Sequence, residues 1–172
     1  MNIEDIKKFA ERWLDDNSQE FNKLADFIWD NPELGLEEFG AFSEVTELLR
    51  KYDFDIESGI GSMPTAFIAT YGTEGPVIGI NVEYDCLPGL SQQSSKPYPC
   101  PVIEGAPGQG CGHNILCSSA VKSGVAIRQV IEEFGLKATI KLFGSPYEEA
   151  SVGKAIVGRT GAYKNVDCFL DW

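Results

Sequence analysis

A thiol and an imidazole lie close together in residues 110–114, which read Gly-Cys-Gly-His-Asn. Cys111 stands two residues before His113, the single histidine of the chain. In a loop, this spacing lets both side chains turn to one side, and the flanking glycines let the backbone approach a bound ion. Thiolate and imidazole are both good ligands for Zn²⁺ or a similar transition metal. For an isolated Cys-x-His pair, packing of the cysteine and a capping role for the histidine is the better explanation. Here the pair ends a long loop and opens a predicted helix, whose N-terminus would stabilise a thiolate or a metal-bound hydroxide, so both explanations stay open.

Two adjacent carboxylates, Glu148 and Glu149, follow the apolar run 138–143 through Gly-Ser-Pro. Adjacent glutamates by themselves carry little information, because the pairs at 37–38 and 132–133 occur as well. The position of Glu148 and Glu149 just after a buried strand is what distinguishes them. Metal-dependent chemistry can use such a pair unequally: one carboxylate binds a cation, and the other takes a proton from the metal-bound water and later passes it to a leaving amine.

A third acidic candidate, Asp85, lies in residues 83–88 (Glu-Tyr-Asp-Cys-Leu-Pro), directly after the apolar run 77–82. An acid at this place would bridge two metals or orient a ligand histidine. The alternative is a turn-forming aspartate before a proline-containing loop. Other chemistries lack their motifs: residues 108–112 have no Lys-Ser/Thr of a phosphate loop, and no Gly-x-Ser-x-Gly is present. A thiol-redox pair of Cys111 and Cys117 is a weaker alternative.

Helices and strands alternate along the chain in a way that would place these residues together. Apolar residues at helical spacing predict a helix ending before Pro32 and a second over 42–52. Strands are expected at 65–71, 76–82, 138–143 and 166–170, with a glycine turn between the first two and a long loop over 92–109. A helix is expected over 115–134, with Asn114 as its N-cap and Gly135 as its C-terminal stop. The pattern predicts an α/β sheet with helices on both faces and ligands at the carboxyl ends of its strands.

Composition narrows the class of protein and its surroundings. The length of 172 residues fits one domain, and 43% of the residues are hydrophobic, which is typical of a folded chain. A formal net charge of −12 makes nucleic acid and anionic membrane surfaces poor partners. No apolar run is long enough for a membrane span, and residues 1–14 predict an amphipathic helix rather than a signal peptide. Five scattered cysteines point to a reducing cytoplasm.

Four segments together carry a resemblance to a known family: 29–33 (Trp-Asp-Asn-Pro-Glu), 83–88, 110–114 and 145–149 (Ser-Pro-Tyr-Glu-Glu). With these motifs in family order, essentially the whole chain resembles the metallo-amidohydrolase branch of the aminoacylases and zinc carboxypeptidases. The resemblance implies a three-layer α/β/α fold of the zinc-exopeptidase type. It also implies hydrolysis of amide bonds in N-acyl or N-aroyl amino acids or small peptides, with two zinc or manganese ions as cofactors.

The resemblance also implies roles for individual residues. Cys111 and His113 correspond to two metal ligands, Glu149 to a third ligand and Glu148 to the general base. Asp85 falls in the acidic strand-end motif and is expected to support the site without binding metal. Gln109 stands where the family commonly has a histidine that is not a ligand, so it is expected to alter the hydrogen bonds around the ligands.

The chain also departs from the family in length. The family places a further histidine ligand just after the last expected strand and another near its C-terminus, and it carries an inserted dimerisation domain. We therefore expect residues 1–172 to be the N-terminal part of a catalytic domain, truncated, with an incomplete metal site. The expected partners are a small amide substrate and either a second copy or a complementary half. The alternative is an inactive fragment or oligomerising module that retains part of the metal site.

Overall fold

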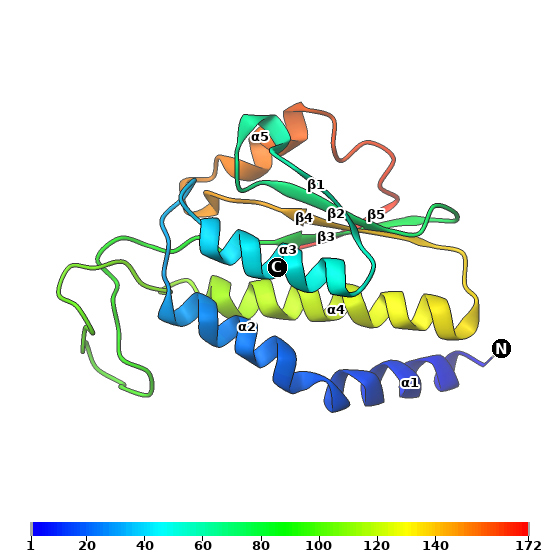
Figure 1. The fold of residues 1–172 in the computed structure, drawn as a ribbon, viewed down its shortest axis with the longest axis horizontal. Coiled ribbons are helices and arrows are strands. Elements are labelled where there is room, and N and C mark those ends of the chain that lie inside the picture. Colours follow the sequence, from blue (N-terminus) through cyan, green and yellow to red (C-terminus); the bar gives the residue numbers. More distant parts are fainter. Residues whose placement is uncertain (1, 172) are drawn as a thin grey trace.

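A five-stranded mixed sheet runs through the middle of the molecule in the computed structural model, which describes residues 2–171 (Figure 1). Its strand order is β1-β2-β4-β3-β5. The pairs β1–β2 and β2–β4 are antiparallel, whereas β3 runs parallel to both β4 and β5. The strands are β1 (Asp55–Ser58), β2 (Phe67–Tyr71), β3 (Val77–Val82), β4 (Thr139–Gly144) and β5 (Cys168–Leu170).

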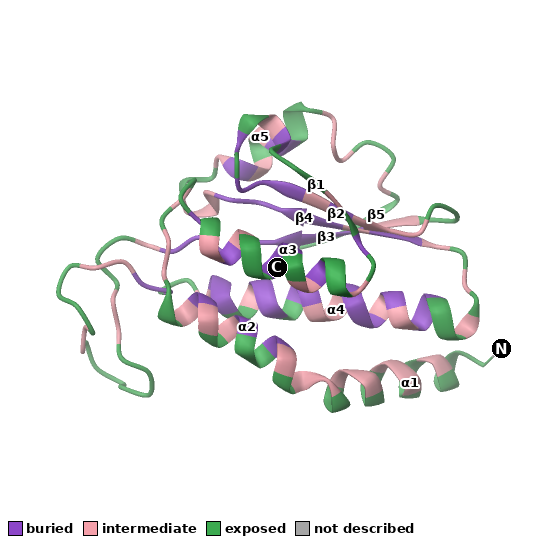
Figure 2. Ribbon diagram, in the orientation of Figure 1, coloured by how far each residue is buried: buried purple, intermediate pink, exposed green. Residues whose placement is uncertain are grey.

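Helices cover both faces of this sheet, as the sequence predicted (Figure 1). The helix α4 (His113–Phe134) packs directly on β3 and β4, and α1 (Ile3–Asp16) and α2 (Ser18–Asp30) pack on α4. α3 (Phe39–Lys51) lies beside them, while α5 (Gly153–Arg159) lies on the opposite side of the sheet (Figure 1). Buried residues concentrate on the central strands and on the sheet-facing side of α4 (Figure 2).

The expected helix before Pro32, the helix over 42–52 and the four expected strands all appear, with shifts of a few residues at their ends. Helix α1 corresponds to the helix expected over 1–14, of which Met1 lies outside the described residues, as does Trp172. The strand β1 and the helix α5 were not predicted. β1 is short and mostly exposed, so it carries no apolar alternation to reveal it.

The predicted start of α4 was wrong. The helix begins at His113, and its N-cap is Gly112 in the left-handed conformation. Asn114 is inside the first turn and buried, and its side-chain amide donates to the carbonyl of Ala25. A tertiary contact with α2 therefore uses the side chain that would otherwise have capped the helix. Gly135 ends α4 in the left-handed conformation, as predicted.

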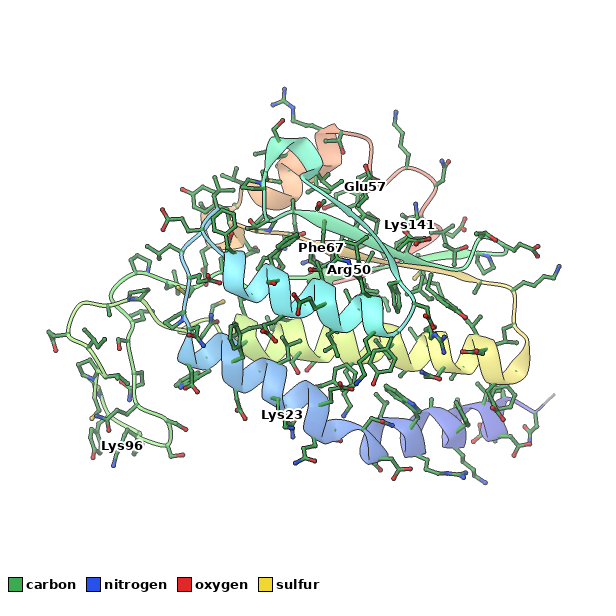
Figure 3. The ribbon with its side chains drawn as sticks, in the orientation of Figure 1. Lys23, Arg50, Glu57, Phe67, Lys96 and Lys141 are labelled. Atoms are coloured by element: carbon green, nitrogen blue, oxygen red, sulfur yellow. The ribbon has the colours of Figure 1, made fainter. Side chains whose placement is uncertain are left out.

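The loop between β3 and α4 projects from the body of the molecule, with Lys96 near its outer end (Figure 3). Inside the body, the Phe67 ring is fully buried and stacks on Tyr84 with ring centroids 6.2 Å apart. No helix within residues 2–171 is long and apolar enough to cross a membrane. The strand ends thus lie on a packed core, and the loop leads the chain from β3 back to the start of α4.

The turn between β2 and β3 offers a test of the fold. A Cβ atom at Gly75, which has φ of +72°, would lie 2.0 Å from the Lys137 carbonyl oxygen. We expect Gly75→Ala to lower the free energy of unfolding by more than the ~1–2 kcal/mol of left-handed alanine alone. Gly89→Ala is the matched control, because Gly89 has φ of +73° and its Cβ would meet nothing within 4 Å. Denaturant unfolding of both variants measures the difference, and equal losses would show that the turn does not pack as described.

Candidate metal centre

The site forms where β3 and β4 end side by side. These strands are parallel and in register, with Val82 opposite Gly144, so the segments that follow them emerge at the same edge of the sheet. β3 leads to Glu83 and Asp85, and β4 leads to Glu148 and Glu149. His113, the first residue of α4, reaches the same edge and is only 1% exposed.

The imidazole of His113 is surrounded by carboxylates. Its Nδ1 atom lies 2.9 Å from the Asp85 carbonyl oxygen and 3.1 Å from Asp85 Oδ1. Burial would lower the pKa of His113, but the hydrogen bond and charge of Asp85 outweigh it, and the pKa is raised. Contacts of Nδ1 with two oxygens favour the tautomer that carries the proton on Nδ1, which leaves Nε2 free to bind a cation. Nε2 faces Glu83 and Glu148, whereas Nδ1 is the nitrogen that lies 3.9 Å from Glu149 Oε1.

Glu148 and Glu149 are presented by a tight turn with unusual backbone geometry. They begin the 3₁₀ turn η2 (Glu148–Ala150), which is flanked by Tyr147 and Ser151, both with φ of 56°. Non-glycine residues in this left-handed region each cost about 1–3 kcal/mol and persist where surrounding contacts hold them. Asp85 supplies one such contact, because its Oδ2 accepts the Glu149 amide at 3.0 Å. Asp85 therefore touches both the histidine and the glutamate turn.

Cys111, His113 and Glu149 each place one possible ligand atom within 4.8 Å of the other two. The Glu149 Oε1 atom is buried, and no hydrogen bond reaches it from residues 2–171. Burial raises the pKa of Glu149, while partial desolvation and the nearby Glu149 carboxylate raise the pKa of the Cys111 thiol, which is exposed on one side. A sulfur, a nitrogen and an oxygen at this separation fit a divalent transition metal, whose charge would offset this repulsion. The three ligands predicted from the sequence are thus brought together.

A second group shares the histidine. Glu83, His113 and Glu148 also offer ligand atoms within 4.8 Å of one another, with His113 Nε2 at 3.5 Å from Glu83 and 3.7 Å from Glu148. A cationic side chain already lies against this group: Lys154 Nζ is 2.7 Å from Glu83 and 3.3 Å from Glu148. The ammonium neutralises much of its charge, so the group containing Cys111 is the stronger candidate for a metal.

Sequence reasoning missed two residues of this site, Glu83 and Lys154. Glu83 was recognisable as an acid at a strand end, beside the chosen Asp85, and it is 5% exposed. Lys154 gave no signal, because it follows Glu148 by six residues and reaches the site only through the course of η2 and α5. Both residues lie against the group that holds Glu148.

Gln109 lies just before the metal-binding candidates and is buried, with 7% exposed. Its Oε1 accepts the Asn114 amide at 3.2 Å, which ties the loop before Cys111 to the first turn of α4. The thiol-redox alternative finds no support, since Cys117 is fully buried and burial raises the pKa of its thiol well above the usual value.

Known proteins of similar sequence point to one class of enzyme. No protein-family model matches the chain. One of the subunits of the p-aminobenzoyl-glutamate hydrolase of Escherichia coli is 36% identical over 170 residues, which are 99% of this chain and 35% of that protein. The mouse Xaa-Arg dipeptidase is 26% identical, over 96% of this chain and 37% of the relative. The chain belongs to the metallo-amidohydrolase family. It spans about a third of the length of these metallo-amidohydrolase relatives.

Solved structures show that the metallo-amidohydrolase fold is shared. A dinuclear metal-binding peptidase of Bacillus subtilis superposes with a TM-score of 0.71 at 23% identity, over 89% of this chain and 43% of that one. An aminobenzoyl-glutamate utilization protein of Klebsiella pneumoniae gives 0.66 at 16% identity, over 93% and 44%. The three-layer α/β/α architecture expected from the sequence is therefore confirmed.

Proposed function

We propose that this chain carries the metal-binding part of an amidohydrolase in which Cys111, His113 and Glu149 hold a divalent cation, zinc or manganese. The observation that carries the proposal is the convergence of these three side chains within 4.8 Å of one another. His113 is held in place by Asp85, as a ligand histidine commonly is by a neighbouring carboxylate. Residues 1–172 would form the N-terminal part of the catalytic domain, and sequence outside them would complete a two-metal centre.

The proposed reaction is hydrolysis of an amide bond, with Glu148 as general base. A divalent cation, when bound, supplies Lewis-acid polarisation of the amide carbonyl and lowers the pKa of water. Glu148 is partly exposed beside the ligand cluster, so it can accept a proton from the attacking water and return it to the leaving nitrogen. Lys154 lies 3.3 Å from the Glu148 carboxylate and helps to hold it in place. Asp85 fixes both His113 and the Glu149 amide.

The proposed substrate class is N-acyl or N-aroyl amino acids and small peptides. It is supported by the names of the relatives, which include the aminobenzoyl-glutamate hydrolase and a hippurate hydrolase of Campylobacter jejuni that is 24% identical. We propose a second copy or a complementary half as protein partner, because the Escherichia coli relative is itself one subunit of an enzyme. A reducing cytoplasm suits the five free cysteines of residues 2–171.

The proposal is tested by metal analysis and hydrolysis assays. The 172-residue chain, and the full product of its gene, would be purified, loaded with zinc or manganese and dialysed. We expect stoichiometric metal in both and turnover of p-aminobenzoyl-glutamate, hippurate or an N-acetyl amino acid by the full product. No bound metal and no turnover, with a defined oligomer instead, would contradict the proposal and favour an inactive assembly module.

A further inference from the structure

A buried glutamate outside the metal cluster, Glu38, accepts a hydrogen bond from the turn that carries Glu148 and Glu149. Glu38 stands one residue before α3 and is 0% exposed. One of its carboxylate oxygens accepts the Thr65 hydroxyl at 2.8 Å, and the other accepts the backbone amide of Tyr147 at 2.9 Å. A buried carboxylate is costly unless it is hydrogen-bonded, and here one of its hydrogen bonds goes to the turn that carries Glu148 and Glu149.

Tyr147 has a backbone conformation that needs support from outside the turn. It has φ of 56° and ψ of 39°, an uncommon conformation for a residue with a side chain. Its ring lies against Gly35, where a Cβ atom would come within 1.9 Å of the ring carbon Cδ2. The segment between α2 and α3 therefore contacts Tyr147 in two ways. The Glu38 carboxylate accepts its backbone amide, and the Tyr147 ring packs in the space that Gly35 leaves by having no side chain.

The same segment is anchored to the other end of the site. The Glu33 carbonyl accepts the Cys86 amide at 2.9 Å, next to Asp85. The Glu33 carboxylate accepts the Gly40 and Ala41 amides at 2.8 and 2.9 Å, which fixes the start of α3 beside Glu38. Glu38 is thus fixed relative to the end of β3 that carries Asp85. Its hydrogen bond to the Tyr147 amide in turn fixes the turn after β4 relative to Asp85.

We propose that Glu38 is a positioning residue, whose carboxylate holds the Tyr147 peptide so that Glu148 and Glu149 face His113. This inference rests on the proposed function, since it assigns Glu38 to the same site. Asp85 holds the turn at the Glu149 amide, and Glu38 holds it two residues earlier at the Tyr147 amide. With both bonds in place the direction of the two glutamates is fixed. Without Glu38, the Tyr147 end of the turn keeps only the packing of its ring on Gly35.

The test compares three substitutions by zinc affinity, measured by competition with a chromophoric chelator. Glu38→Met keeps the length of the side chain but removes both acceptors, and we expect it to weaken zinc binding about 10- to 100-fold, as losses of ligand-orienting contacts do. Glu38→Gln retains a carbonyl acceptor for the Tyr147 amide and should restore most of the affinity. Glu37→Gln is the matched control, because Glu37 is the exposed neighbour and loses the same charge. A folded Glu38→Met variant with wild-type zinc affinity would overturn the proposal.

A metal-independent measurement separates this inference from the proposed function. Amide hydrogen exchange of the metal-free chain by NMR should quicken in Glu38→Met at Tyr147 and also at Glu149, whose amide bonds to Asp85 and not to Glu38. Unchanged exchange at Glu149 would overturn the positioning role even if the wild type binds zinc. If the wild type binds no metal, the proposed function fails, but the exchange data still test whether Glu38 positions the turn. Should Glu38→Met not fold, Gly35→Ala tests the same turn, because its Cβ must displace the Tyr147 ring.

Discussion

Replacing Glu148 with glutamine is expected to lower the turnover number of the full gene product by about 10²- to 10⁴-fold, the usual contribution of a general base. The amide keeps the size of the side chain but cannot accept a proton. Zinc affinity should change little, because Glu148 lies outside the Cys111, His113 and Glu149 group. A large loss of turnover at unchanged metal content would therefore identify Glu148 as the base.

Two controls sharpen this measurement. Glu133→Gln removes the same charge from an exposed position on α4 and should leave turnover unchanged. Glu149→Gln should lower metal content as well as turnover, because it alters a proposed ligand. Steady-state kinetics with one N-acyl amino acid and metal analysis of the same samples are sufficient. Retained turnover in Glu148→Gln would remove Glu148 from the role of base.

Replacing Cys111 with serine is expected to weaken zinc binding by more than about 100-fold, because the loss of a ligand should exceed that of a residue that only orients one. A serine hydroxyl is a much poorer zinc ligand than a thiolate. Cys111 is exposed, so the substitution should leave the fold intact. Cys168→Ser is the matched control, because Cys168 is also exposed and free and lies on the edge strand β5.

The pH dependence of zinc binding provides a second test of Cys111 as a ligand. The thiol must lose its proton to bind metal, and partial desolvation together with the Glu149 carboxylate raises the pKa of Cys111 above its usual value. Zinc affinity of the wild type should therefore rise as pH increases toward that pKa, and the part of the slope due to the thiol should vanish in Cys111→Ser. Equal affinities of the two proteins at every pH would exclude Cys111 as a ligand.

The sequence by itself indicated most of the local elements and the candidate residues of the proposed metal site. Apolar periodicity predicted the central strands and the helices before and after them, and Gly135 marked the end of α4 because left-handed backbone favours glycine. Cys111, His113 and the two glutamates after β4 were found from residue type, from position at strand ends and from a family resemblance. The residues of each of these motifs lie within a few positions of one another, at 110–114 and at 145–149, so they can be recognised from the sequence alone.

Only the tertiary structure decided which distant side chains serve that chemistry. Glu38 meets the Tyr147 amide across 109 residues, and Lys154 meets Glu83 across 71. No spacing rule joins such pairs, because their distance depends on the parallel register of β3 with β4 and on the left-handed turn at Tyr147. A tertiary contact also explains why the start of α4 was predicted wrongly. The Asn114 side chain donates to a carbonyl of α2 instead of capping the helix. Local propensity acts over one turn or strand, whereas these contacts form only when the layers pack.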